Sequence, residues 1–158
     1  MKKKKGAALA VISETLVLIS LMFSIMSTSV LVNVTLNKSK NLNCEIKNEV
    51  LQLMEDIEYS INGVSGYSAI LSRFNVLAIT RGYSKTSGST TNPFYTKNAG
   101  RSTERNISVK TDTVKGYITI EYYRKNPLTS QLSLYCTCIL KNSGTNNIYN
   151  ITSWSYRI

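Results

Sequence analysis

Histidine is absent from this 158-residue chain, and cysteine, proline and tryptophan are scarce, with three, two and one copies. Without histidine, the chain lacks the usual general base near neutral pH and the usual nitrogen ligand for transition metals. The cysteines do not replace it, because Cys136 and Cys138 are separated by one residue, Cys44 is far upstream, and no Cys-x-x-Cys pair exists. We therefore expect no metal site and no cofactor.

Catalytic patterns are missing as well. No nucleophile accompanied by a base, no pair of carboxylates in a recognisable context and no phosphate-binding loop is visible in the sequence. At this length the chain can hold one compact domain and a membrane anchor, and a second independent enzyme domain is excluded. We therefore predict that the protein is not an enzyme.

Acidic residues are few, since 9 Asp and Glu stand against 19 Lys and Arg, for a formal net charge of +10. The four lysines Lys2–Lys5 lie together at the N-terminus, and removing these four from +10 leaves +6. A basic surface of this size could attract anionic lipid, teichoic-type polymers or DNA. No motif supports DNA binding, and a solvated surface rich in lysine is the simpler interpretation.

Charge is nearly missing from residues 7–34, where Glu14 is the single charged residue. About 20 apolar helical residues cross the roughly 30 Å hydrocarbon core of a bilayer, so this segment is long enough to span a membrane. The preceding lysines predict a cytoplasmic N-terminus, with the rest of the chain outside. A secretory signal cleaved near Ser27–Ser29 is the alternative, but the apolar run is about twice the usual length of a signal core. We expect an uncleaved, single-pass anchor.

The N-terminal sequence, Lys-Lys-Lys-Lys-Gly followed by Ala-Ala-Leu-Ala-Val-Ile-Ser-Glu-Thr-Leu, resembles the class III leader of type IV prepilins and pseudopilins. In that family a dedicated prepilin peptidase cuts after a glycine that ends a short basic leader, and it methylates the new N-terminus. The resemblance therefore implies cleavage between Gly6 and Ala7 and N-methylation of Ala7. It also implies a pilin-like fold, in which a long N-terminal helix packs on a small antiparallel sheet.

One position departs from the family pattern. The fifth mature residue, usually Glu in the family, is Val11 here, and the nearest acid, Glu14, is the eighth residue counted from Ala7. The family's acid is thought to pair with the α-amino group of a neighbouring subunit. Glu14 lies three residues further along, about 4.5 Å away on nearly the same helix face, and could form this assembly contact with a shifted stagger. Alternatively, Glu14 extends to the cytoplasmic headgroups, away from the costly bilayer interior.

A second apolar pattern follows the anchor. Apolar side chains recur at steps of three or four residues: Leu42, Ile46, Val50, Leu53, Ile57 and Ile61. This spacing predicts one face of a helix that packs on a sheet, ending at Asn62-Gly63. Charged residues fall mostly on the opposite face: Glu45, Lys47, Glu55, Asp56 and Glu58. The helix either continues the anchor without interruption or starts after a break at residues 33–43.

Residues 67–80 fit two patterns. Tyr67, Ile70 and Phe74 suit one face of a helix, whereas residues 76–80 suit a strand, and the sequence leaves both open. Residues 84–105 are rich in Ser, Thr, Gly and Asn and predict a long surface loop.

The last third of the chain predicts three or four antiparallel strands. They correspond to four β-rich runs, at residues 107–110, 117–124, 132–140 and 148–156. In the third run the alternating residues share one face, which we expect to meet the helix: Leu132, Leu134, Cys136, Cys138 and Leu140. The two cysteines are then core residues, too far apart for an unstrained bond with each other. A disulfide from Cys44 to either one remains an alternative outside the cytoplasm.

The expected organisation is thus an α+β chain with four parts. These are a basic leader (1–6), a transmembrane and assembly helix (7–35), an amphipathic helix (36–62) and an extracytoplasmic head (63–158) that contains the loop at 84–105.

The resemblance implies a structural subunit, a minor pilin or pseudopilin of a type IV pilus, a competence pseudopilus or a type II secretion-like filament. Its partners would be other pilin-like subunits, the prepilin peptidase and membrane lipid, first at the cytoplasmic membrane and then at the cell surface. Two alternatives stay open: a membrane-anchored extracytoplasmic binding protein that does not polymerise, and an enzyme secreted after cleavage near Ser29. The N-terminus distinguishes them, because only a prepilin loses residues 1–6 alone.

Overall fold

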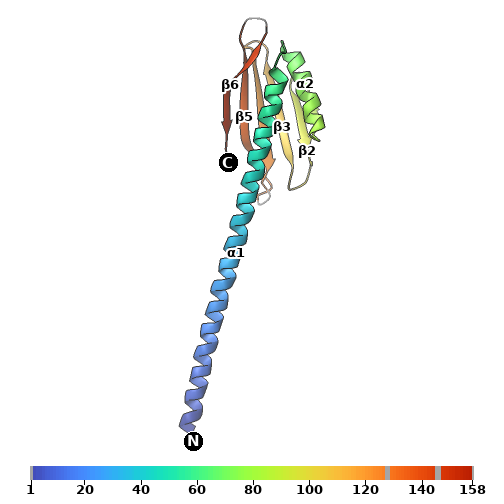
Figure 1. Cartoon of the computed structure of the whole chain (residues 1–158). Coiled ribbons are helices and arrows are strands. Elements are labelled where there is room, and N and C mark those ends of the chain that lie inside the picture. Colours follow the sequence, from blue (N-terminus) through green and yellow to red (C-terminus); the bar gives the residue numbers. More distant parts are fainter. Residues whose placement is uncertain (1, 127–128, 145–146, 158) are drawn as a thin grey trace. The chain divides into compact units, whose positions relative to one another are not determined.

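The computed structural model describes residues 2–126, 129–144 and 147–157, with side chains from residue 11 onward. The chain divides into two compact units, Met1–Cys44 and Glu45–Ile158. Helix α1 (Lys2–Ile61) contributes to both units (Figure 1). Every residue from 33 to 43 is helical, so the helix has no break there. It ends at Ile61, and Gly63 follows with a positive φ of 65° that glycine adopts without strain.

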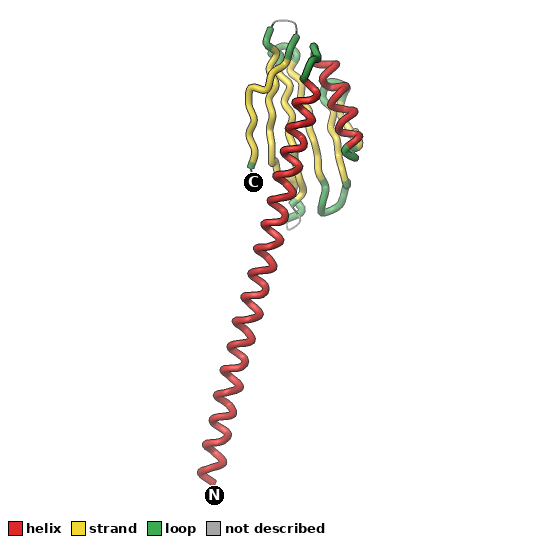
Figure 2. Tube along the Cα trace, in the orientation of Figure 1, coloured by secondary structure: helices red, strands yellow, loops and turns green. Residues whose placement is uncertain are grey.

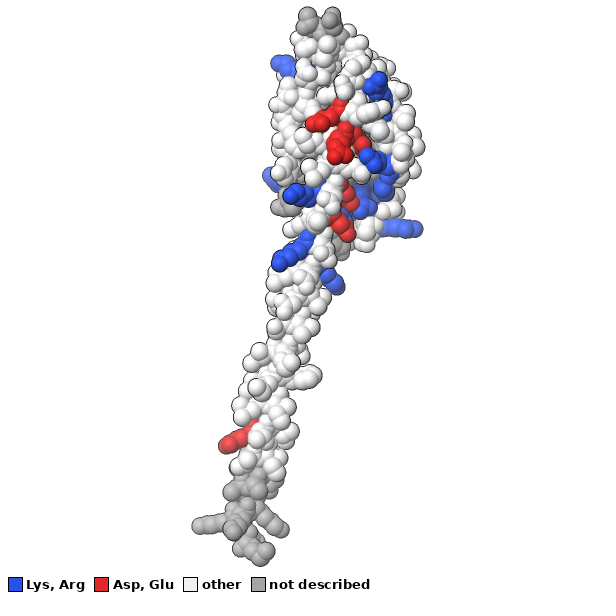
Figure 3. Space-filling model, viewed as in Figure 1, with Lys and Arg blue, Asp and Glu red and all other residues white. Residues whose placement is uncertain are grey.

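The first unit is a helix with an apolar surface. Large apolar side chains from Val11 to Leu36 are 45% to 73% exposed, and Glu14 is the single charged residue among them (Figure 3). The hydroxyls of Thr15 and Thr35 donate to backbone carbonyls one turn earlier, at 3.0 and 2.8 Å. Such bonds satisfy hydroxyl groups in an apolar environment. In the described part of the chain, α1 is the one helix long and apolar enough to cross a membrane.

The second unit contains one antiparallel sheet of six strands in sequential order (Figure 2). The strands are β1 (Ser84–Gly88), β2 (Pro93–Lys97), β3 (Arg105–Asp112), β4 (Tyr117–Lys125), β5 (Leu132–Asn142) and β6 (Tyr149–Tyr156). The four predicted C-terminal strands are thus present, with slightly different ends. Each strand pairs with its neighbour in the sequence, which gives a simple meander.

The predicted loop at 84–105 is wrong over much of its length, because β1 and β2 form a hairpin there. Every residue of β1 is exposed, so this edge strand has no alternation of apolar and polar residues to indicate it. Pro93 is the first residue of β2, a position where proline removes little hydrogen bonding from the sheet. A real loop remains between Asn98 and Glu104.

Two helices cover one face of the sheet (Figure 2). The predicted helical stripe of α1 is confirmed in this unit, since Ile46, Val50, Leu53 and Ile57 are 0% to 5% exposed. Of the two alternatives for residues 67–80, the structure has the helix, α2 (Tyr67–Thr80). It buries Ile70, Leu71, Phe74 and Ala78. The sheet contributes a matching layer: Tyr95, Ile107, Val109, Ile118, Ile120, Tyr122, Cys136, Cys138 and Leu140. Burial of each large side chain contributes about 1.5–3 kcal/mol.

The expected apolar face of β5 is only half correct. Cys136 pairs with Tyr122, but Leu134 pairs with Tyr123, so an extra residue interrupts β5 at position 135. Because paired residues share a face, this β-bulge turns Leu134 and Leu132 to the face away from the helices. They are 41% and 48% exposed, respectively.

The two cysteines of β5 are core residues, as predicted. Cys136 and Cys138 are buried free thiols, and burial raises the pKa of each to about 12. Cys44 is exposed on α1. No disulfide involving Cys136 or Cys138 is formed.

Candidate functional site

The residues that the resemblance singles out lie on the first turns of α1. Gly6 and Ala7 lie in the part of α1 that is described by its backbone alone, and cleavage and methylation there stay predictions. Glu14 is exposed on a helix surface formed by large apolar side chains. A role for Glu14 in subunit contact also stays a prediction.

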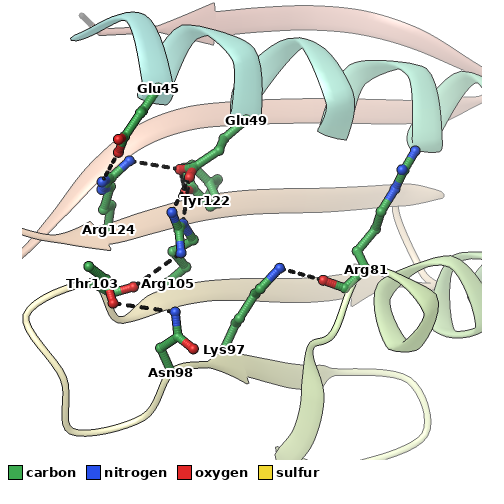
Figure 4. A network of polar contacts seen from close by, with 9 residues as sticks. All are labelled: Glu45, Glu49, Arg81, Lys97, Asn98, Thr103, Arg105, Tyr122 and Arg124. Atoms are coloured by element: carbon green, nitrogen blue, oxygen red, sulfur yellow. Dashed lines mark hydrogen bonds and ion pairs between the residues drawn. The ribbon is translucent and has the colours of Figure 1, made fainter. Parts of the chain in front are cut away.

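A second polar site, in the unit Glu45–Ile158, is built around Glu49 on α1 (Figure 4). Its oxygens accept hydrogen bonds from three strand residues: Arg105 Nε at 2.6 Å, Arg124 Nη1 at 3.1 Å and the Tyr122 hydroxyl. Glu45, one helical turn earlier, accepts from Arg124 Nη2 at 2.7 Å. We call these five residues the Glu49 cluster. It joins α1 to β3 and β4.

The most buried charge of the cluster, the Arg124 guanidinium, is paired with carboxylates. The Arg124 side chain is 5% exposed, whereas the side chains of Glu49 and Glu45 are 21% and 59% exposed. Two carboxylates therefore hold one buried guanidinium, and breaking such a pair leaves an uncompensated charge in a poorly solvated site. Arg124 Nε is buried without a partner among the described residues.

The pKa values in the cluster follow from these contacts. The hydrogen bond from Arg124 lowers the pKa of Glu45. Burial alone would lower the pKa of Arg105, but the hydrogen bond and charge of Glu49 outweigh it, and the pKa is raised. Burial, with the charge of Glu49, raises the pKa of Tyr122 far above its ordinary value. These three groups thus keep their usual protonation states at neutral pH.

A further ion pair lies along the same helix, where the sequence predicted a solvent-facing acid. Asp56 is only 8% exposed and accepts two hydrogen bonds from Arg81, from Nη2 at 3.1 Å and from Nε at 3.2 Å. Arg81 caps the C-terminus of α2, so this bidentate pair fastens α2 to α1. The hydrogen bond to Asp56 raises the pKa of Arg81.

Between the Glu49 cluster and the Asp56–Arg81 pair lies a pocket of 160 Å³ under α1. Charged and polar side chains line it: Glu49, Gln52, Asp56, Arg81, Tyr83, Lys97, Arg105 and Tyr122. Apolar side chains complete it: Leu53, Phe74, Ala78 and Ile107. Within the described ranges, no three His, Cys, Asp or Glu side chains lie close enough to hold a metal ion together.

The sequence contains weak signals for this site. Glu45 and Glu49 are four residues apart, so they share one side of a helix, and Tyr122 and Arg124 are two apart, so they share one strand face. Neither spacing tells which helix face meets which strand face. Arg105 is the first residue of β3, but it belongs to the segment that was predicted to be a loop, so the sequence did not indicate its position on a strand.

Comparison of the chain with known proteins matched no family model, no curated protein and no solved structure. The fold is α+β, with a long N-terminal helix and a six-stranded antiparallel sheet.

Proposed function

We propose that the chain is a structural subunit, a minor pilin or pseudopilin, that assembles with other subunits through residues 7–35 of α1. One observation carries this proposal. The large apolar side chains from Val11 to Leu36 are exposed on a helix whose later residues, from Ile46 to Ile57, pack on an antiparallel sheet. A surface of this kind needs either lipid or other apolar helices around it.

The surface of α1 is compatible both with lipid and with the apolar helices of other subunits. Lipid tails are as apolar as leucine, so helices associate in a membrane through close packing, which small residues allow. Ser20, Ser24 and Thr28 recur at every fourth residue of α1, and the Thr28 hydroxyl bonds back to the Ser24 carbonyl. This serine and threonine row offers a side on which a second helix can approach closely. Subunits would move from lipid into a helical bundle without exposing apolar surface to water.

Processing would prepare the helix for this assembly. The lysines before Gly6 favour a cytoplasmic N-terminus, and cleavage after Gly6 would remove them together. The new α-amino group of Ala7 would then lie near the level of Glu14 in a neighbouring subunit. A carboxylate at the centre of a membrane helix costs about 2.5–3.5 kcal/mol, and pairing with an amino group would offset that cost.

Processing is tested by determining the N-terminus of the membrane-extracted protein, co-expressed with and without a prepilin peptidase. We expect the mature chain to begin at Ala7 and to carry one added methyl group only when the peptidase is present. Gly6→Leu is the control, which should keep the leader in both conditions. A wild-type chain that keeps residues 1–6 in the presence of active peptidase argues for a simple tether, and one that begins near Val30 argues for secretion.

Assembly is tested by cross-linking in the membrane. In a Cys44→Ser background, Ser20→Cys should form a disulfide between two copies, because the serine and threonine row is the expected contact side. Met22→Cys is the matched control, since Met22 lies two residues away on a different side of the helix. Equal cross-linking at both positions, or none at either, would contradict assembly through this side.

A further inference from the structure

One lysine of the pocket under α1, Lys97, pairs with no carboxylate of the residues that the structure describes. Lys97 Nζ donates to the Arg81 carbonyl oxygen at 2.6 Å (Figure 4). It also lies 5.6 Å from the centre of the Tyr83 ring. The ion pairs among the described residues do not include Lys97. An ammonium group carries three donors, so Lys97 keeps donors for a further acceptor.

The two acids of the pocket are already engaged by other cations. Glu49 accepts hydrogen bonds from Arg105, Tyr122 and Arg124. Asp56 forms its bidentate pair with Arg81. With Lys97 added, the lining holds three cations and two anions. The pocket therefore carries one excess positive charge, located at Lys97.

The rest of the lining limits what can bind there. Leu53, Phe74 and Ala78 form an apolar part of the wall, and each is at most 5% exposed. Burial raises the pKa of Tyr83 to about 12, so its hydroxyl keeps its proton at neutral pH, and Tyr122 is its hydrogen-bond partner. The volume of 160 Å³ is below the roughly 300 Å³ of sites for drug-sized ligands, so only a small molecule fits.

We propose that this pocket binds a small monocarboxylate. Its carboxylate accepts a hydrogen bond from the Lys97 ammonium group, and its short apolar group lies against Leu53, Phe74 and Ala78. An oxyanion without an apolar group would leave that part of the wall unfilled, and an uncharged molecule would leave the Lys97 charge without a partner. The site does not depend on the proposed role in assembly, because all its residues belong to the unit Glu45–Ile158.

Binding is measured on the full-length protein in a nonionic detergent by ligand-observed NMR, with benzoate, acetate and inorganic phosphate as probes. Empty micelles correct for partition of benzoate into detergent. We expect benzoate to bind more tightly than acetate or phosphate. Lys97→Met should weaken benzoate at least about tenfold, the effect of losing one charge-assisted hydrogen bond. Lys141→Met is the matched control, because Lys141 also lies over a tyrosine ring, at 5.7 Å, but outside the pocket.

A second variant keeps Lys97 in place. Ala78→Val narrows the apolar part of the pocket, so it should weaken benzoate more than acetate while both still require Lys97. Thermal melting identifies a variant that does not fold. If one of Lys97→Met and Ala78→Val fails to fold, the benzoate affinity of the other tests the proposal. The proposal is overturned if benzoate does not bind, if it binds equally to wild type and Lys97→Met, or if phosphate alone binds through Lys97.

Discussion

Replacement of Glu49 by Gln tests whether the Glu49 cluster holds α1 on the sheet. Glutamine has nearly the same shape and keeps one acceptor oxygen, so the substitution removes the charge while leaving the packing in place. The Arg124 guanidinium, whose side chain is 5% exposed, would then be left with Glu45, whose side chain is 59% exposed. Arg105 and Tyr122 would lose a charged acceptor at the same time.

The expected cost follows from this geometry. Removing one partner of a buried pair costs about 3–5 kcal/mol, because the remaining charge stays in a poorly solvated site. Domains of this size are stabilised by only about 5–15 kcal/mol in total. A loss of this size should lower the melting temperature by about 10 °C or more.

The assay is thermal and denaturant unfolding of the full-length protein in detergent, followed by circular dichroism. Glu58→Gln is the matched control, since Glu58 is an exposed acid on the same helix and should change stability by less than about 0.5 kcal/mol. If Glu49→Gln unfolds within that same margin of wild type, the cluster does not stabilise the contact between α1 and the sheet.

Two further predictions concern the core of the same unit. Ile57→Ala should destabilise it by about 2–5 kcal/mol in denaturant unfolding, because Ile57 is 0% exposed. Ile79→Ala on α2 should have little effect, because Ile79 is 54% exposed; similar losses for both would contradict the packing described. Stability should also fall as the pH rises above about 9, because the thiols of Cys136 and Cys138, with folded pKa values near 12, ionise more readily in the unfolded chain. Melting temperatures between pH 7 and 11 check this, and replacing both cysteines by alanine should move the onset toward the higher pH at which tyrosines ionise.

The sequence determined the features that depend on neighbours along the chain. An apolar segment with one charge indicates a helix that can span a membrane, and steps of three and four residues identified the side of α1 that carries Ile46 to Ile57. Alternating residues in the last third indicated four strands. Each of these patterns is a local consequence of helix or strand geometry, so no knowledge of distant residues was needed.

Tertiary structure decided everything that depends on residues far apart. The strand β1 has no apolar alternation, and it forms because β2 pairs with it. A single extra residue in β5 turned Leu132 and Leu134 to the other face. Glu49 reaches partners 56, 73 and 75 residues away. Such contacts arise only when a helix face and a sheet face meet in one register, and side-chain spacing along the chain carries no information about that meeting.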